Sequence, residues 1–459
     1  MTSAVPAEPA RFERRLIAPM VIGGILNPIN SSMLAVALIP IGASFGVPPS
    51  ETAWLITGLY LATAVGQPVV GRLVDLYGPR PLYLIGTAVV GIAGLLGALA
   101  PTLGVLIVSR VLLGFGTSAA YPASMSLIRS EADRTGMKTP AGILSILSVS
   151  NQVIAVIGPT LGGLLIGLGG WHLIFTINVP LSVICVILGV LWLPGRGRPR
   201  TRAAGRLDYP GIALFTATLV SLMLFLMQPR LSRWYLVVLA VALGVAFVLV
   251  QLRVVEPFID LQVLGGNVPL IATYIRQVLA MVGSYAFLYG FPQWLEEGRG
   301  LGAASAGLLM LPLSVSAVLI IVITGRRAKV RGKLVAGSIL LAAAAIAPQF
   351  VGAQTVIAVL ALVGVLAGLS QGLTGLANQN ALYHQADPAR IGSSAGLLRT
   401  CGYVGALIAA AANAQFFQHG ATTAGLHELS LFLLVLACLL VLVTVLDRSL
   451  GRIGSTQPT

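Results

Sequence analysis

Charged residues are scarce in this chain of 459 residues, at 9%, whereas hydrophobic residues make up 57%. Soluble domains usually have about a quarter of their residues charged. A soluble chain of this length would also divide into domains joined by polar linkers, but here apolar segments follow one another to the end. The shortage of charge argues against an ordinary soluble protein and indicates one whose main solvent is lipid.

Cysteine and histidine are also rare, with three and four residues. Cys185, Cys401 and Cys438 lie in apolar segments without metal-ligand spacing, so we interpret them as small packing residues. The histidines show no paired spacing for zinc, and the sequence has no phosphate-binding GxxxxGK[ST] loop. We therefore expect no metal, no cofactor, no drive by ATP and no enzymatic activity.

Apolar segments of about 20 residues are long enough to cross a bilayer as helices. The first is too long for a signal peptide, so we expect it to remain uncleaved. The expected fold is an all-α integral membrane protein of about fourteen transmembrane helices. The predicted spans are 17–44, 53–70, 82–100, 103–127, 142–167, 172–193, 209–228, 234–252, 268–292, 303–324, 333–351, 355–380, 395–417 and 428–446.

The net charge of +14 comes from basic residues in short loops between apolar segments. Of the 28 Lys and Arg, three fall in loops on one predicted side (Arg230, Arg233 and Arg299), three lie within spans, and the remaining 22 fall on the other side. This asymmetry is typical of the positive-inside rule rather than of nucleic-acid binding. It predicts a multi-pass protein of the cell inner membrane, with both termini cytoplasmic and membrane lipids as neighbours.

The segment Pro194–Arg206 is the most polar break in the chain, and it separates six spans from eight. Its arginines favour either a linker beside anionic headgroups or a plain topology signal. A weak repeat, with Gly-Arg at 71–72 and again at 325–326, suggests two related halves, a known plan of transporters. We expect an N-terminal tail (1–16), a six-helix bundle (17–193), a linker (194–208), an extra helix pair (209–252), a second bundle (253–447) and a C-terminal tail (448–459).

The segment after the second span contains Gly71, Arg72, Asp75, Gly78 and Arg80 in the order GRLVDLYGPR. Its glycines permit tight turns, and its aspartate can bind backbone N–H groups or an arginine as a charged latch between the halves. This pattern resembles the signature loop of the major facilitator superfamily. The resemblance implies two six-helix bundles around a central cavity and transport by alternating access.

The fifth span contains Gly158-Pro159-x-x-Gly162-Gly163, which resembles the antiporter motif of drug-efflux members of that superfamily. Proline bends a helix and glycines allow close packing. Two further segments, Trp171–Pro180 and Leu207–Gly211, resemble the start of helix six and of the extra helix pair in the fourteen-spanner drug:proton antiporters. The family motifs indicate little about the substrate.

Arg110 and Gly114 resemble the helix-four motif of the family, whose arginine is associated with proton transfer, although Leu113 replaces its usual glutamine. A charge in mid-membrane is expensive and marks function by default; the alternative is hydrogen bonding to carbonyls of the first helix. The family aspartate of helix one is Asn30 here, and no Asp or Glu lies in the middle of a predicted span. Since asparagine cannot titrate, this departure argues against proton coupling.

Polar side chains within spans should face the interior of the bundle, either lining a cavity or joining helices. All charged candidates, Arg110, Arg276 and Arg399, are positive, which favours neutral or anionic ligands over lipophilic cations. Glu296 and Glu297, which end the ninth span, are interpreted as a gate, as a collector of protons or cations, or as a solvated loop face. The cavity candidates are Asn27, Asn30, Asn151, Gln152, Tyr274, Arg276, Gln277, Tyr285, Tyr289, Gln371, Asn378, Arg399 and Tyr403.

These observations favour a monomeric secondary transporter of small organic molecules. The first hypothesis is efflux of drugs or toxic compounds, because of the antiporter-like motif. The second is import or facilitated passage of a neutral or anionic nutrient such as a vitamin or flavin, because of Asn30. A membrane sensor or scaffold with the same fold has no positive support in the sequence.

Overall fold

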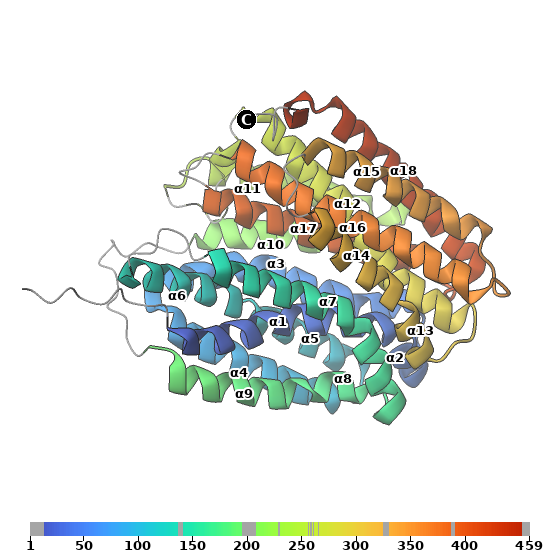
Figure 1. Ribbon diagram of the computed structural model, residues 1–459, viewed down its shortest axis with the longest axis horizontal. Helices are drawn as coiled ribbons and strands as arrows, with labels where there is room; N and C mark the ends of the chain where they lie inside the picture. The colour runs from blue at the N-terminus through green and yellow to red at the C-terminus, as the bar shows by residue number, and fades with distance from the viewer. Residues whose placement is uncertain are drawn as a thin grey trace, which may run out of the picture.

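A computed structural model describes residues 13–135, 141–194, 208–227, 230–255, 257, 259, 261–264, 266–324, 330–386 and 391–451. The described chain is built of helices joined by short turns (Figure 1). The α-helices are α1 (Ile17–Met33), α2 (Leu38–Phe45), α3 (Pro49–Tyr77), α4 (Pro79–Ala98), α5 (Leu103–Thr117), α6 (Ala120–Thr135), α7 (Ala141–Gly169), α8 (His172–Thr176), α9 (Asn178–Trp192), α10 (Tyr209–Met227), α11 (Trp234–Gln251), α12 (Val268–Glu297), α13 (Ala303–Leu309), α14 (Leu311–Thr324), α15 (Val330–Ile346), α16 (Ile357–Gln385), α17 (Ile391–Phe416) and α18 (Thr423–Leu446).

Thirteen helical segments among the described residues are long and apolar enough to cross a membrane, and Ile157–Gly169 of α7 is a shorter apolar helix. Together they correspond to the predicted spans, which confirms the expected all-helical membrane fold. Some spans consist of two helices in line. The first, for example, joins α1 to α2 through the 3₁₀ turn η2 (Leu34–Val36).

The structure corrects the predicted loop at 71–80. Helix α3 continues to Tyr77, and α4 begins at Pro79, so only Gly78 interrupts the two helices. Gly78 has φ 89°, a conformation that favours glycine. Hydropathy marked the point where α3 leaves the apolar layer, but backbone hydrogen bonding continues beyond that point until a residue breaks it.

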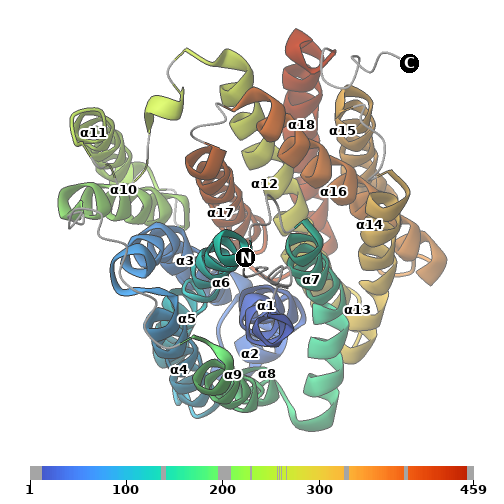
Figure 2. The same cartoon turned by 60° about the vertical axis from the view of Figure 1, so that its left-hand side comes forward.

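Helices α1–α9 form one bundle and α12–α18 form a second (Figures 1 and 2). The bundles meet where α3 packs against α17, α7 against α13 and α14, and α12 against η2 and α2. We call this contact the bundle seam. The end of the molecule where α2, α8 and α13 lie is called the α13 end, and the opposite end the α6 end (Figure 1).

The extra helices α10 and α11 pack against each other, and α10 joins the pair to the bundles. Helix α10 packs against both α3 and α17, so it covers one side of the seam (Figure 2). Its last residue, Met227, lies in a buried cluster with Ala53 of α3 and Ala411 of α17. The pair is joined at its other end, where Gln251 donates a hydrogen bond to Asp208.

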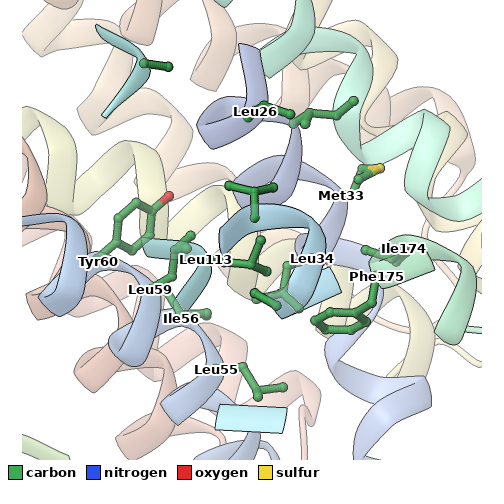
Figure 3. Packing of buried hydrophobic residues seen from close by; sticks show 14 of the residues in the cluster. Leu26, Met33, Leu34, Leu55, Ile56, Leu59, Tyr60, Leu113, Ile174 and Phe175 are labelled. Carbon is green, nitrogen blue, oxygen red and sulfur yellow. The ribbon is translucent and has the colours of Figure 1, made fainter. Parts of the chain in front are cut away.

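The core of the first bundle is a cluster of leucine, isoleucine and phenylalanine side chains (Figure 3). Leu34, Leu113 and Phe175 are completely buried in it. Since lipid is as apolar as leucine, the close fit of these side chains, rather than removal from water, holds the helices together. Tyr60 lies at the edge of this cluster and belongs also to the seam (Figure 3).

An ion pair near the α6 end predicts an acid-sensitive contact. Glu131 accepts a hydrogen bond from the Glu13 N–H at 3.0 Å and pairs with Arg134. The Arg134 hydrogen bond, more than the Glu13 N–H, holds the pKa of Glu131 below its ordinary value of 4.5. A carboxyl group whose pKa is lower in the folded protein than in the unfolded protein stabilises the fold at pH values above its unfolded pKa. This stabilisation is lost as the pH falls through the pKa of the folded protein.

We therefore expect Glu131→Gln to lower the unfolding temperature of the detergent-solubilised protein at neutral pH. Below pH 4.5, the unfolding temperature of this variant should fall less steeply with pH than that of the wild type. Glu51→Gln is the control, because Glu51 is exposed in the first turn of α3. Equal acid dependence in wild type and Glu131→Gln would contradict the assignment.

Candidate functional site

Four tyrosines meet on the bundle seam. Tyr60 comes from α3, Tyr285 and Tyr289 from α12, and Tyr403 from α17. The Tyr60 ring centroid lies 5.1 Å from that of Tyr285 and 5.9 Å from that of Tyr403, and Tyr285 stacks on Tyr289 at 6.1 Å. These separations are within the range of favourable aromatic contacts. We call this group the tyrosine cluster.

Hydroxyl groups of the tyrosine cluster join the two bundles. The Tyr60 and Tyr289 hydroxyl oxygens lie 2.9 Å apart, and the Tyr289 hydroxyl donates to the Ser31 carbonyl of α1 at 3.0 Å. On the same face of α3, the Gln67 amide donates to the Tyr403 hydroxyl at 3.0 Å. Tyr60 and Tyr289 are completely buried, whereas Tyr285 and Tyr403 are partly exposed. Tyr285 and Tyr403 therefore keep part of their surface uncovered by protein.

A cation lies beside the tyrosine cluster. Arg399 is one helical turn from Tyr403, and its guanidinium carbon lies 3.7 Å from the ring centroid of Tyr121 on α6. The contact is a cation–π interaction across the seam. The buried Nη1 of Arg399 has no hydrogen-bond partner among the described residues. Arg399 can thus donate to a ligand without giving up another hydrogen bond at Nη1.

Four predicted residues, Tyr285, Tyr289, Arg399 and Tyr403, are brought together here. Tyr60 and Gln67 were not among the predicted residues. Both are polar residues in the second span at i, i+7 spacing, which places them on one helix face, and this signal was available.

The first bundle places Asn30 differently from the prediction of a cavity residue. Asn30 is completely buried, and its amide exchanges two hydrogen bonds with the amide of Asn178 on α9, at 2.5 and 2.9 Å. Asn30 therefore joins helices within the first bundle instead of facing the tyrosine cluster. Asn27 donates to Thr117 at 3.0 Å, and Asn151 lies beside Gly24 of α1.

Arg110 is also completely buried in the first bundle. Its Nε donates to the Leu55 carbonyl and its Nη1 to the Asn30 carbonyl, both at 3.1 Å. The bond to Asn30 is of the kind that the predicted alternative names, a helix-one carbonyl, whereas Leu55 belongs to α3. Gly114, one turn on, permits contact with α3, since a Cβ there would lie 2.6 Å from the Leu59 oxygen.

In the second bundle, Arg276 forms an ion pair with Asp447 at 2.7 Å and is completely buried. The Tyr274 hydroxyl donates to the Ser394 carbonyl at 3.1 Å, and Asn378 donates to Gln277 at 3.2 Å. These candidates join α12 to α16, α17 and the segment after α18. Gln371 lies partly exposed on α16, and the side chain of Gln152 lies outside the described part of the chain.

The glycine motif of α7 packs on two sides. Gly158 and Gly162 face α1, where a Cβ on Gly162 would lie 2.7 Å from the Met33 oxygen. Gly163 faces α13 of the other bundle, where a Cβ would lie 2.5 Å from the Ala303 oxygen. Thr160 adds a hydrogen bond to the Gly307 carbonyl at 2.9 Å. The motif around Pro159 therefore closes the seam at the α13 end.

The predicted charged latch is only partly described. Arg80 donates to the Val190 carbonyl of α9 at 2.9 Å, and Gly71 faces Pro122 of α6. The side chains of Arg72 and Asp75 lie outside the described part, as do residues 325–329 of the second repeat copy. A latch at Asp75 stays a prediction.

The carboxylates at the end of α12 correct one sequence interpretation. Glu297 is exposed and accepts a hydrogen bond from the Ala421 N–H at 2.8 Å. Glu296, by contrast, is only 8% exposed, and its Oε1 has no hydrogen-bond partner among the described residues. It is therefore not part of a solvated loop face. In the described chain no three His, Cys, Asp or Glu side chains gather to hold a metal ion.

Comparisons with known proteins agree with this architecture. Residues 20–410 match the model of the Major Facilitator Superfamily. The chain is 32% identical to the MFS-type transporter YwoD of Bacillus subtilis (90% of this chain, 92% of the relative). It is 32% identical to the lincomycin resistance protein of Streptomyces lincolnensis (64% and 61%) and 24% identical to the riboflavin transporter RibZ of Clostridioides difficile (87% of each).

A solved structure of the peptide transporter POT has the same fold, with a TM-score of 0.68 at 15% identity, covering 96% of each chain. The family match begins in α1 and ends in α17, so it covers the extra helix pair and all of the two bundles except their outermost residues and α18. The chain thus belongs to the major facilitator superfamily and is a multi-pass membrane transporter of that family.

Proposed function

We propose that this transporter moves small planar aromatic molecules across the cell inner membrane by alternating access of its two bundles. The tyrosine cluster is the observation that carries the proposal, because α3, α12 and α17 build it from both sides of the seam. A ligand held there contacts both bundles, so its binding depends on how they are arranged. Aromatic faces with hydroxyl tips suit planar molecules that carry polar groups.

The charges near the seam favour neutral or anionic ligands. Each of the three arginines has one buried nitrogen without a partner among the described residues, but Arg110 and Arg276 are buried within their own bundles, whereas Arg399 lies beside Tyr403. No described carboxylate contacts the tyrosine cluster through a hydrogen bond or ion pair. A lipophilic cation would meet Arg399 without a compensating negative charge.

Efflux of drugs or toxic compounds is the favoured direction. It is supported by the glycine motif of α7 and by similarity to the lincomycin resistance protein. Uptake or facilitated passage of a vitamin or flavin is the alternative, supported by Asn30 and by similarity to a riboflavin transporter. The bias of basic residues supports a cytoplasmic α6 end, in which case the closed α13 end faces outward.

Ligand binding to the purified protein tests the proposal. Riboflavin serves as the neutral planar probe and ethidium as the planar cation. We expect Tyr403→Ala to weaken riboflavin binding by roughly three- to tenfold, since an aromatic pair contributes about 0.5–1.5 kcal/mol. Tyr235→Ala, which removes an exposed tyrosine of α11, should change nothing.

Flux of labelled probe into vesicles, with and without a proton gradient, then gives direction and coupling. Clear preference for ethidium over riboflavin, or equal binding by the Tyr403→Ala and Tyr235→Ala variants, would contradict the proposed site. Absence of flux for every probe would favour a sensor.

A further inference from the structure

The described carboxylates that are buried all have partners except one. Glu131 pairs with Arg134, Asp208 bonds Gln251 and the Gly211 N–H, and Asp447 pairs with Arg276. Glu296, at the α13 end of α12, is the exception, with its buried Oε1 left without a partner. Burial without a partner is far more expensive for a charged carboxylate than for a protonated one.

Helix geometry places Glu296 on the seam. It follows Tyr289 by seven residues, which is two helical turns, so both side chains lie on one face of α12. Tyr289 reaches Tyr60 and the Ser31 carbonyl of the first bundle, so this face is turned toward that bundle. Helix α12 also packs against η2 and α2 of the first bundle. The first bundle therefore covers Glu296 while the seam is closed.

We propose that Glu296 is a proton-binding site of the seam, protonated while the α13 end is closed and deprotonated when that end opens to water. Separating η2 and α2 from α12 exposes the carboxyl group, which then releases its proton to the surrounding water. Closing the seam again requires a proton to return to the carboxylate. Proton binding and closure of the α13 end are thereby linked.

Other titratable groups do not account for this site. The elements η2, α2 and α13 contain none. On α18, His427 contacts the Val351 carbonyl at 2.9 Å and Glu428 is exposed. The titratable groups of α17 are Arg399, Cys401 and Tyr403, and those of α16 are Tyr383 and His384. Within the turn after Glu296, Arg299 donates to the Thr355 carbonyl.

This site gives the transporter a titratable carboxyl group despite Asn30. It rests on the alternating access proposed above but not on any particular substrate. Its test needs no ligand, so it can fail while the aromatic binding site stands, and the reverse also holds.

The experiment measures the distance between the bundles as a function of pH. Spin labels are placed on cysteines introduced at the exposed residues Ala43 of α2 and Ser305 of α13, after replacement of Cys185, Cys401 and Cys438 by serine. The full chain is studied in lipid nanodiscs. We expect the population with a long label separation to rise with pH in the parent protein.

Glu296→Gln imitates the protonated acid, so it should keep the short separation at every pH. Glu297→Gln, the matched control at the exposed neighbour, should titrate like the parent. His419→Gln and His427→Gln should do so as well, because neither histidine is the proposed group.

A Glu296→Gln protein that follows the parent curve would overturn the proposal. So would a parent protein whose separation does not change with pH, or a pH response lost in a histidine variant and kept in Glu296→Gln. If Glu296→Gln folds poorly, Glu296→Asp provides the second test, since it keeps the carboxyl group and must keep a pH response.

Discussion

Gly163→Ala is expected to open the seam at the α13 end and to reduce transport by more than tenfold. The added Cβ would lie 2.5 Å from the Ala303 oxygen and 3.1 Å from the Ala304 Cα, and neither backbone atom can turn aside as a side chain would. Such overpacking costs roughly 1–3 kcal/mol. If this acts only on the closed state, about 2 kcal/mol shifts the conformational equilibrium by more than tenfold.

Gly167→Ala is the matched control. It lies one turn further along the same face of α7, but its Cβ would meet only the Ala304 Cβ at 3.7 Å, an ordinary contact. Vesicle flux and the spin-label separation between α2 and α13 are the measurements. Equal behaviour of the two alanine variants would show that the α7–α13 contact does not limit the transport cycle.

Asp447→Ala is expected to lower stability by about 3–5 kcal/mol, because it leaves the buried Arg276 charge without its counter-ion. Arg276 is completely buried, and the Asp447 side chain is only 6% exposed. Thermal unfolding in detergent measures the loss. This ion pair joins α12 to the end of α18. Its loss should therefore also make the position of α12 at the seam less fixed.

A double-mutant cycle separates the ion pair from other effects. Arg276→Met with Asp447→Ala removes both charges, and it should be more stable than Asp447→Ala alone because no unpaired charge stays buried. Asp447 also accepts hydrogen bonds from Ser449 at 2.5 and 3.0 Å, and this part of the loss should persist in the double variant. Strict additivity of the two substitutions would show that the pair is not coupled.

The candidate site could be predicted in part. Tyr285, Tyr403 and Arg399 were found because a polar side chain in an apolar segment must turn toward protein. The same rule selected Asn30, Arg110 and Arg276, which instead join helices inside their bundles. A polar residue that faces protein lines a site or joins two helices, and only the identity of the neighbouring helix separates these outcomes.

Glu296 shows the complementary case, in which the sequence left a functional carboxylate and a solvated loop face both open. At a predicted helix end, a pair of adjacent glutamates has the sequence pattern of a solvated turn. One helical position decides the outcome: Glu297 accepts a hydrogen bond from the Ala421 N–H at the surface, whereas Glu296 is buried.

The amino-acid sequence by itself determined the membrane fold and the number of spans, since long apolar segments fix helices in lipid through local hydrogen bonding alone. The two-bundle plan was implied by the family resemblance. The tertiary structure decided which polar groups meet across the seam. That pairing joins residues more than two hundred positions apart, such as Tyr60 and Tyr289, through helix rotations that depend on the packing of every neighbour.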